Sequence, residues 1–393
     1  MQEYGELLPP ERLLLGPGPA NVDPRVLRSL SLPVVGYTDP FLYGVLDDIQ
    51  ELLRYVFQTS NRLTLPVSGT GSAGMEMAVH NLVEEGDEVV VGIAGFFGDR
   101  IVQVIKRAGG KVIPVETEWG RALEAEKIED ALKNSNAEVI AVVHGETSTG
   151  VLQPLEKIAK IAKEYDALLL VDAVTTLGGS EIKVDGLGID ACYSCSQKCL
   201  GCTPGLAPVT FSKKAYDKIA NRKKELRSWY LDVRLVEKYW SGDRVYHHTP
   251  PVSMLYALRE ALRIIREEGI EDRWRRHETT GRALIRGLEA LGMALLVEDE
   301  EIRLPQLTTV LIPNGLDDAA TRKELLERYG IEIGGGLGPF KGKVWRIGLM
   351  GYNANVKNVL HLLSALEKIL KKHGFPVKNG EAVKAASEYL ESR

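Results

Sequence analysis

The stretch Leu168-Leu169-Leu170-Val171-Asp172-Ala173-Val174 decides how this chain folds. It is a short apolar run that ends in a carboxylate, which is typical of a strand buried on both faces of a parallel sheet. Similar runs alternate with amphipathic stretches between about residues 63 and 212. We expect strands at 88–92, 111–115, 138–143, 167–171, 191–194 and 207–211, and helices at 72–84, 99–108, 127–133 and 155–165. Strands that alternate with helices predict an α/β fold whose mostly parallel sheet has helices on both faces.

The pattern changes after residue 211. Two long helical patterns occupy 253–268 and 272–291, and the remainder predicts a smaller α+β unit. Its expected strands are 294–297, 307–312 and 344–347, and its expected helices are 319–329, 356–372 and 380–391. We therefore divide the chain into a large domain of residues 14–270 and a small domain formed by residues 1–13 and 271–393.

Composition excludes several classes of function. The chain has 393 residues, 44% of them hydrophobic, and a net charge of −5 with acidic and basic residues interspersed. This balance disfavours a nucleic-acid-binding face, and no apolar run reaches the roughly 18 residues of a membrane span. The start, Met1-Gln2-Glu3-Tyr4-Gly5-Glu6, has neither the basic residues nor the apolar segment of a secretion signal, and the end is not a peroxisomal address. The cytoplasm is the expected compartment.

A second motif, Tyr193-Ser194-Cys195-Ser196-Gln197-Lys198, ends another short strand in a lysine. Ligands of such sheets bind at the carboxyl ends of the strands, where Asp172 and Lys198 both fall. Pyridoxal phosphate (PLP) needs this pair, because a lysine holds its aldehyde as a Schiff base and a carboxylate keeps its pyridine nitrogen protonated. Either residue alone is more typical of a strand cap or a surface lysine. Together, at two strand ends, they favour the cofactor.

All four cysteines surround this lysine with the spacing C-x2-C-x3-C-x2-C, at Cys192, Cys195, Cys199 and Cys202. The spacing suggests zinc or an iron–sulfur cluster. We disfavour a metal site because Cys192 and Cys195, both on the expected strand, then point to opposite faces, and because Lys198 lies inside the supposed cluster. Small buried side chains beneath the lysine turn explain the cysteines more simply.

Three further segments supply what a PLP site requires. The turn 68–76, Ser-Gly-Thr-Gly-Ser-Ala-Gly-Met-Glu, can hold a phosphate at a helix start, although such turns also occur without ligands. In Gly95-Phe96-Phe97-Gly98, one phenylalanine can lie over a pyridine ring while the other packs. Arg346, between Trp345 and Ile347 on a strand, can bind a carboxylate bidentately or form a structural ion pair.

With these segments the chain resembles a class V, fold type I, PLP-dependent aminotransferase of the alanine–glyoxylate / serine–pyruvate group. The resemblance spans nearly the whole chain and implies a seven-stranded, mostly parallel sheet in the large domain. The segments that carry it are Leu13-Leu14-Leu15-Gly16-Pro17-Gly18-Pro19, the turn 68–76, His144-Gly145-Glu146-Thr147-Ser148-Thr149-Gly150, Val171-Asp172-Ala173-Val174, Ser196-Gln197-Lys198, Tyr246-His247-His248-Thr249 and Arg346-Ile347-Gly348.

The resemblance also implies roles for individual residues. Lys198 and Asp172 are catalytic, the first as the aldimine lysine and the second as the partner of the pyridine nitrogen. The other implied cofactor contacts are Val174 and Phe97 on the ring faces, Thr147 at the ring hydroxyl, Gly71, Ser72 and Gln197 at the phosphate, and Tyr246 and Thr249 at the phosphate of the other subunit of a homodimer. Arg346 takes the substrate carboxylate, and Gly18 and Tyr37 line the entrance. No metal is implied.

One position departs from the family pattern, because mammalian-type members have tryptophan where this chain has Phe97. This affects the expected substrate preference more than cofactor binding. We interpret His144 as a turn residue that supports Thr147 and not as a catalytic base, since the lysine already moves the proton.

The function implied is transamination between a small amino acid, L-alanine or L-serine, and a small 2-oxo acid, glyoxylate or pyruvate. Aspartate or 2-aminoethylphosphonate are alternative donors, although no second arginine stands out for a distal carboxylate. Cysteine desulfuration is disfavoured, because no cysteine follows Cys202. A non-catalytic binding protein with this fold is the remaining alternative, and it predicts loss of Lys198 or Asp172.

Overall fold

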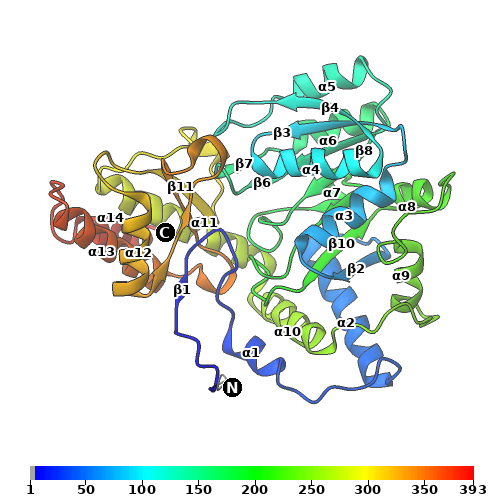
Figure 1. Ribbon diagram of the computed structural model, residues 1–393, viewed down its shortest axis with the longest axis horizontal. Helices are drawn as coiled ribbons and strands as arrows, with labels where there is room; N and C mark the ends of the chain where they lie inside the picture. The colour runs from blue at the N-terminus through cyan, green and yellow to red at the C-terminus, as the bar shows by residue number, and fades with distance from the viewer. Residues whose placement is uncertain (1–4) are drawn as a thin grey trace.

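A central sheet of seven strands organises the larger part of the molecule (Figure 1). The computed structural model describes residues 5–393. In spatial order the strands are β2 (Leu63–Ser68), β10 (Leu206–Phe211), β9 (Ala191–Tyr193), β8 (Leu168–Asp172), β5 (Val139–Val143), β3 (Glu88–Ile93) and β4 (Lys111–Glu116). Strand β10 runs antiparallel to both neighbours, and the other pairs are parallel. The mostly parallel α/β sheet predicted from the sequence is confirmed.

The strand order determines which helices share a face. The connecting helices are α3 (Gly71–Leu82), α4 (Phe96–Ala108), α5 (Ala125–Lys133), α6 (Glu156–Glu164) and α7 (Val184–Leu187). Right-handed crossovers place α3 and α4 on one face, because β2→β3 and β3→β4 run in one direction across the sheet. The crossovers from β4 to β5, from β5 to β8 and from β8 to β9 run in the opposite direction across the sheet. Helices α5, α6 and α7 therefore cover the other face. The direction reverses between β3 and β5, and ligands of such sheets bind in the crevice at this point.

Further helices surround the sheet. Helices α2 and α10 pack closely against each other, and α1 packs against α10. These helices are α1 (Pro24–Ser29), α2 (Pro40–Phe57), α8 (Lys213–Ala220), α9 (Val233–Trp240) and α10 (Val252–Glu268). None of the helices within residues 5–393 has the length and apolarity needed to cross a bilayer.

The smaller unit lies beside the sheet and contains the C-terminus (Figure 1). Its three-stranded sheet has the order β11-β14-β13. Its elements are α11 (Ile270–Ala290), β11 (Leu307–Leu311), α12 (Asp318–Tyr329), β12 (Ile331–Glu332), β13 (Gly334–Gly335), β14 (Val344–Gly348), α13 (Val356–Lys372) and α14 (Glu381–Glu391). The N-terminal strand β1 (Leu13–Leu14) joins this unit by pairing with β12. A hairpin of β6 (Gly145–Glu146) and β7 (Val151–Leu152) follows β5.

The described residues form two large hydrophobic cores. One core extends from Val26 to Ile270, and the other combines Leu15 with residues between Ala283 and Ala386. Leu15 packs in the core of the small domain, although the predicted boundary assigns residues 14 onward to the large domain. The first four residues, on which the expectation about secretion partly rests, lie outside the described residues.

Three local expectations were wrong. The expected strand 294–297 is reduced to one bridge between Leu295 and Val310. Strand β9 ends at Tyr193, so Cys195 lies beyond it. Helix α4 begins at Phe96 and not at residue 99, which places both phenylalanines in its first turn.

Candidate active site

Lys198 lies in the turn that follows β9, with only 7% of its surface exposed. Its Nζ donates a hydrogen bond of 3.0 Å to Oγ1 of Thr175. Burial lowers the pKa of Lys198 from its ordinary value. Gly18 lies against its stem, since a Cβ on Gly18 would come within 3.2 Å of the lysine Cγ. The site therefore holds a buried amine that gives up its proton more readily than a surface lysine.

Asp172 ends β8 and lies directly opposite Tyr193 in the register of β8 and β9. The Tyr193 hydroxyl donates to Oδ2 of Asp172 at 2.8 Å, and the backbone N–H of Val174 donates to Oδ1 at 2.8 Å. Burial raises the pKa of Asp172, and these two donors oppose that shift. The two hydrogen bonds fix the orientation of the carboxylate at the carboxyl end of the sheet.

The turn after β2 presents the start of α3 to the same region. The N-cap Thr70 makes no side-chain hydrogen bond to the helix, and the first N–H groups, at Gly71 and Ser72, have no partner among residues 5–393, so they can bind an anion. A Cβ on Gly71 would lie 2.9 Å from the Cβ of Cys195, so this backbone approaches the lysine turn closely. The buried Oε1 of Gln197 has no partner among the described residues.

Phe97 is the aromatic residue that faces the lysine. Its ring centroid lies 5.6 Å from Nζ of Lys198 and 4.9 Å from Cζ of Arg100. Phe96 packs edge-on against it, with the centroids 5.6 Å apart. Of the two phenylalanines, Phe97 is thus the one placed to cover a ring bound at Lys198.

Arg346 on β14 reaches from the small domain toward the same place. Its neighbours Trp345 and Ile347 are fully buried in the small-domain core, whereas its own guanidinium donates to the carbonyls of Gly335 at 2.7 Å and Thr147 at 3.3 Å. Burial lowers its pKa. Within residues 5–393 it forms no ion pair, so its charge is available to a carboxylate.

Tyr37, Tyr246 and Thr249 form a separate cluster. The two tyrosine rings lie 4.7 Å apart, and the Tyr246 hydroxyl is 3.2 Å from Oγ1 of Thr249. Tyr37 and Tyr246 are exposed. Across the described residues, no hydrogen bond or ring contact joins this cluster to Lys198.

We expected His144 to support Thr147, but no hydrogen bond joins the two within residues 5–393. Nδ1 of His144 lies 2.9 Å from Oγ1 of Thr176, and its backbone N–H donates to the carbonyl of Asp172. Burial lowers the pKa of His144 to about 4, so it is neutral at physiological pH. Its role in the fold is to support the chain that follows Asp172.

The four cysteines are free and buried. Burial raises the pKa of Cys195 to about 11 and those of Cys199 and Cys202 to about 12, so the thiols are unreactive. Among residues 5–393, no three His, Cys, Asp or Glu side chains are arranged to hold a metal ion.

Comparison with known proteins identifies the family. The aminotransferase class-V family matches residues 42–357. The chain belongs to the class-V aminotransferases. The aminotransferase is 48% identical to the alanine–glyoxylate aminotransferase of Nostoc sp., with a TM-score of 0.92 over 94% of this chain and 98% of that one. The ureidoglycine–glyoxylate aminotransferase of Bacillus subtilis is 43% identical, with a TM-score of 0.96 over 98% and 100%. The alanine–glyoxylate aminotransferase of Callithrix jacchus is 43% identical over 92% of this chain and 88% of its own.

Aminotransferases of this class and fold depend on PLP, and the residues of this enzyme fit that cofactor. Lys198 is a buried amine whose hydrogen-bond partner is a hydroxyl and not a carboxylate. Asp172 is a buried carboxylate at the neighbouring strand end, and the start of α3 offers unpaired N–H groups close to the lysine turn. The aldehyde, the pyridine nitrogen and the phosphate of the cofactor thus each have a matching group.

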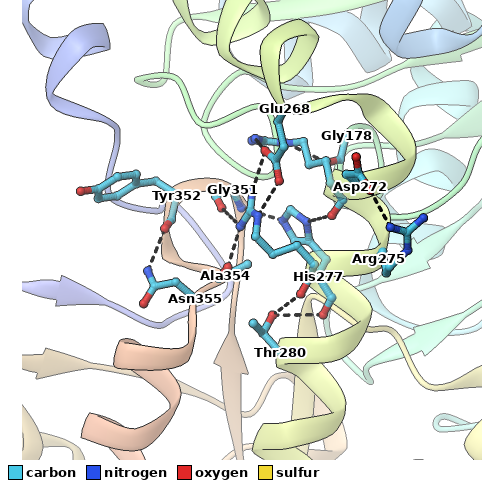
Figure 2. Close-up of polar contacts among 12 residues, drawn as sticks. Gly178, Glu268, Asp272, Arg275, His277, Thr280, Gly351, Tyr352, Ala354 and Asn355 are labelled. Atoms are coloured by element: carbon cyan, nitrogen blue, oxygen red, sulfur yellow. Dashed lines mark hydrogen bonds and ion pairs between the residues drawn. The ribbon is translucent and has the colours of Figure 1, made fainter. Parts of the chain in front are cut away.

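A polar network beneath the lysine turn joins the two domains. The buried guanidinium of Arg273 donates to the carbonyls of Cys199 at 2.7 Å and Gly178 at 3.1 Å and pairs with Glu268. Figure 2 shows His277 of α11 beside Gly351, whose N–H donates to Nε2 of the imidazole at 2.9 Å. The turn that carries Lys198 is thereby fixed to the first helix of the small domain.

Sequence reasoning missed three residues of the site: Thr175, Tyr193 and Glu146. Tyr193 could have been found, because pairing of the two expected strands places it beside Asp172. Thr175 has only its nearness to Asp172 in sequence as a signal. Glu146 appeared only as part of a family segment, although it is buried and accepts hydrogen bonds from α4.

Proposed function

We propose that this aminotransferase uses PLP on Lys198 to move an amino group between a small L-amino acid and glyoxylate. The observation that carries the proposal is the arrangement of Lys198, Asp172 and Arg346. A buried amine with a lowered pKa, a buried carboxylate and an arginine that has no ion pair within residues 5–393 lie at one end of the sheet.

PLP, when bound, supplies the electron sink that weakens the Cα–H bond of an amino acid. Arg346 binds the substrate carboxylate and so fixes the position of the Cα–H bond. Lys198, as a neutral amine, takes this proton on Nζ and releases it again later in the transfer. The hydrogen bond from Nζ to the Thr175 hydroxyl orients Nζ for both steps. Asp172, held by Tyr193, keeps the pyridine nitrogen protonated. Phe97 would cover one face of the ring and Val174 the other, while Gly71, Ser72 and Gln197 would hold the phosphate.

Glyoxylate is the acceptor named for the relatives from Nostoc and Bacillus, and we propose it here, with pyruvate as a second acceptor. L-alanine is the first donor and L-serine the second. (S)-ureidoglycine is a further candidate donor, because the Bacillus subtilis transaminase named for it is 42% identical over 98% of this chain. Aspartate and 2-aminoethylphosphonate rank below these.

We also propose a homodimer with shared sites. Tyr37, Trp229, Tyr230 and Tyr246 are exposed aromatic residues. Within residues 5–393, Tyr246 and Thr249 form no hydrogen bond or ring contact with Lys198 of their own chain. In the dimer, Tyr246 and Thr249 contact the phosphate bound by the other subunit, and Gly18 and Tyr37 line the substrate entrance. Analytical ultracentrifugation of wild type and Tyr246→Ala tests this arrangement.

The experiment that tests the function is a visible spectrum of the purified protein with PLP, followed by separate additions of L-alanine, L-serine, L-aspartate, 2-aminoethylphosphonate and (S)-ureidoglycine. One donor should bleach the yellow band, and glyoxylate should restore it. The Lys198→Ala protein should show neither the band nor turnover. A wild-type protein that stays colourless with PLP refutes the proposal.

A further inference from the structure

Glu146 is a buried carboxylate at the point where the strand order reverses. It ends β6, just after β5, and is 1% exposed. The chain after the neighbouring strand, β3, leads directly into α4 and Phe97. Glu146 and the aromatic residue of the site therefore meet across the crevice in which sheets of this kind bind ligands.

Four donors converge on the two oxygens of Glu146. Oε2 accepts from the N–H groups of Phe97 at 3.0 Å and Gly98 at 3.4 Å, and Oε1 accepts from the N–H of Ser148 at 3.0 Å and its hydroxyl at 2.6 Å. Both oxygens thus act only as acceptors, as in an ionised carboxylate. Burial raises the pKa of Glu146, the hydrogen bonds from Ser148 and Phe97 oppose this shift, and the charge of Asp172 adds to it.

Helix α4 has no side-chain cap from its own sequence. Its N-cap is Gly95, and the cap comes instead from Glu146, which lies 49 residues from Phe97 along the chain. Gly95 makes room for it, because a Cβ there would lie 2.6 Å from Cγ of Glu146. Ser148 completes the attachment, since its Oγ accepts from the N–H of Phe96 at 3.0 Å.

The same loop also contacts Arg346, the residue that we propose binds the substrate carboxylate. The carbonyl of Thr147, next to Glu146, accepts from Nη1 of Arg346. A single loop of three residues, 146–148, therefore contacts both the helix start that carries the ring clamp and the arginine of the small domain.

We infer that Glu146 is a positioning residue that sets the height and tilt of the Phe97 ring over the cofactor, an inference that rests on the proposed binding of PLP at Lys198. A glutamine at this position cannot replace it. Whichever way its amide is turned, the NH2 group faces an N–H or O–H donor, and a buried donor loses its acceptor. The first turn of α4 then shifts, and Phe97 shifts with it.

The experiment compares wild type, Glu146→Gln and Phe97→Leu, alone and combined, by the Kd for PLP and by the visible circular dichroism of the bound cofactor. We expect Glu146→Gln to raise the Kd about tenfold, as the loss of one buried hydrogen-bond partner predicts, and to change the dichroic band. In the Phe97→Leu background it should have little further effect, because the two residues act as one unit.

Glu367→Gln is the matched control. Glu367 is a buried carboxylate of the small domain whose Oε1 accepts from the N–H of Gly380, the residue before α14, at 2.6 Å, so its substitution should leave the Kd for PLP unchanged. Ser148→Ala, a milder change in the same loop, should shift the Kd in the same direction by a smaller factor and covers the case in which Glu146→Gln does not fold.

A Kd and a dichroic band equal to those of wild type in both Glu146→Gln and Ser148→Ala overturn the inference. Fully additive effects of Glu146→Gln and Phe97→Leu overturn it too, because Glu146 then does not act through the ring. If the wild-type protein itself forms no visible band with PLP, the proposed function is refuted, and this result is distinct from the two that overturn the role of Glu146.

Discussion

His277 should make this enzyme less stable at acidic pH, and a single substitution should remove this pH dependence. The side chain is fully buried in α11, where its Nδ1 contacts the carbonyl of Arg273 at 2.8 Å and its Nε2 accepts from Gly351 (Figure 2). Burial first, and then the charges of Arg273 and Arg276, lower its pKa from 6.5 to about 3, and the hydrogen bond to the Arg273 carbonyl and the charge of Glu268 oppose this shift. The folded protein therefore requires a neutral imidazole.

The sign follows from proton binding. Below pH 6.5 the unfolded chain binds a proton at this residue and the folded chain does not. The free energy of unfolding therefore decreases as the pH is lowered, until the pH reaches the folded pKa. With these two pKa values, His277 should cost about 2 kcal/mol of the free energy of unfolding at pH 5 relative to pH 7.5, and about 5 kcal/mol below pH 3.

The assay is urea denaturation at pH 7.5 and pH 5.0, followed by far-ultraviolet circular dichroism. Wild type should lose about 2 kcal/mol more between the two values than His277→Gln, whatever the stability of the variant at pH 7.5. His144, which is also buried and neutral, contributes equally to both proteins and cancels. His361→Gln, which removes an exposed imidazole of α13, is the matched control and should behave as wild type. Equal losses in wild type and His277→Gln would refute the reasoning.

Three further outcomes follow from the site. Gly71→Ala should weaken PLP binding at least tenfold, since its Cβ would lie 2.9 Å from that of Cys195; equilibrium dialysis against PLP measures this, and Cys195→Gly in the same chain should restore part of the loss. Arg346→Lys should raise the KM for the amino donor by about tenfold or more while the Kd for PLP stays constant, because a lysine cannot bind a carboxylate bidentately; an unchanged KM in steady-state assays would remove Arg346 from the substrate site. Tyr246→Phe deletes the hydroxyl that contacts Thr249 and should raise the Kd for PLP several-fold without changing the sedimentation coefficient, whereas unaltered binding would contradict a role at the phosphate.

The sequence predicted those parts of the fold that depend on the local pattern of apolar and polar residues. Strand β8 and its terminal Asp172 were visible because a buried parallel strand is continuously apolar and its end marks the ligand edge. The start of α4 was not predictable, because its cap, Glu146, is distant in sequence. The strand expected at 294–297 had a suitable apolar pattern, but in the structure only Leu295 pairs, with Val310.

The four cysteines around Lys198 have a practical consequence for experiments on this enzyme. Because all four thiols are buried, thiol reagents should modify them only when the protein opens, so the rate of labelling measures opening of the structure around Lys198. Because the native thiols are buried, they should not react with a probe that is aimed at a cysteine on the surface. A cysteine introduced on the surface, for example at the exposed Lys384 of α14, should be the single reactive thiol and carry a fluorophore without removal of any native cysteine.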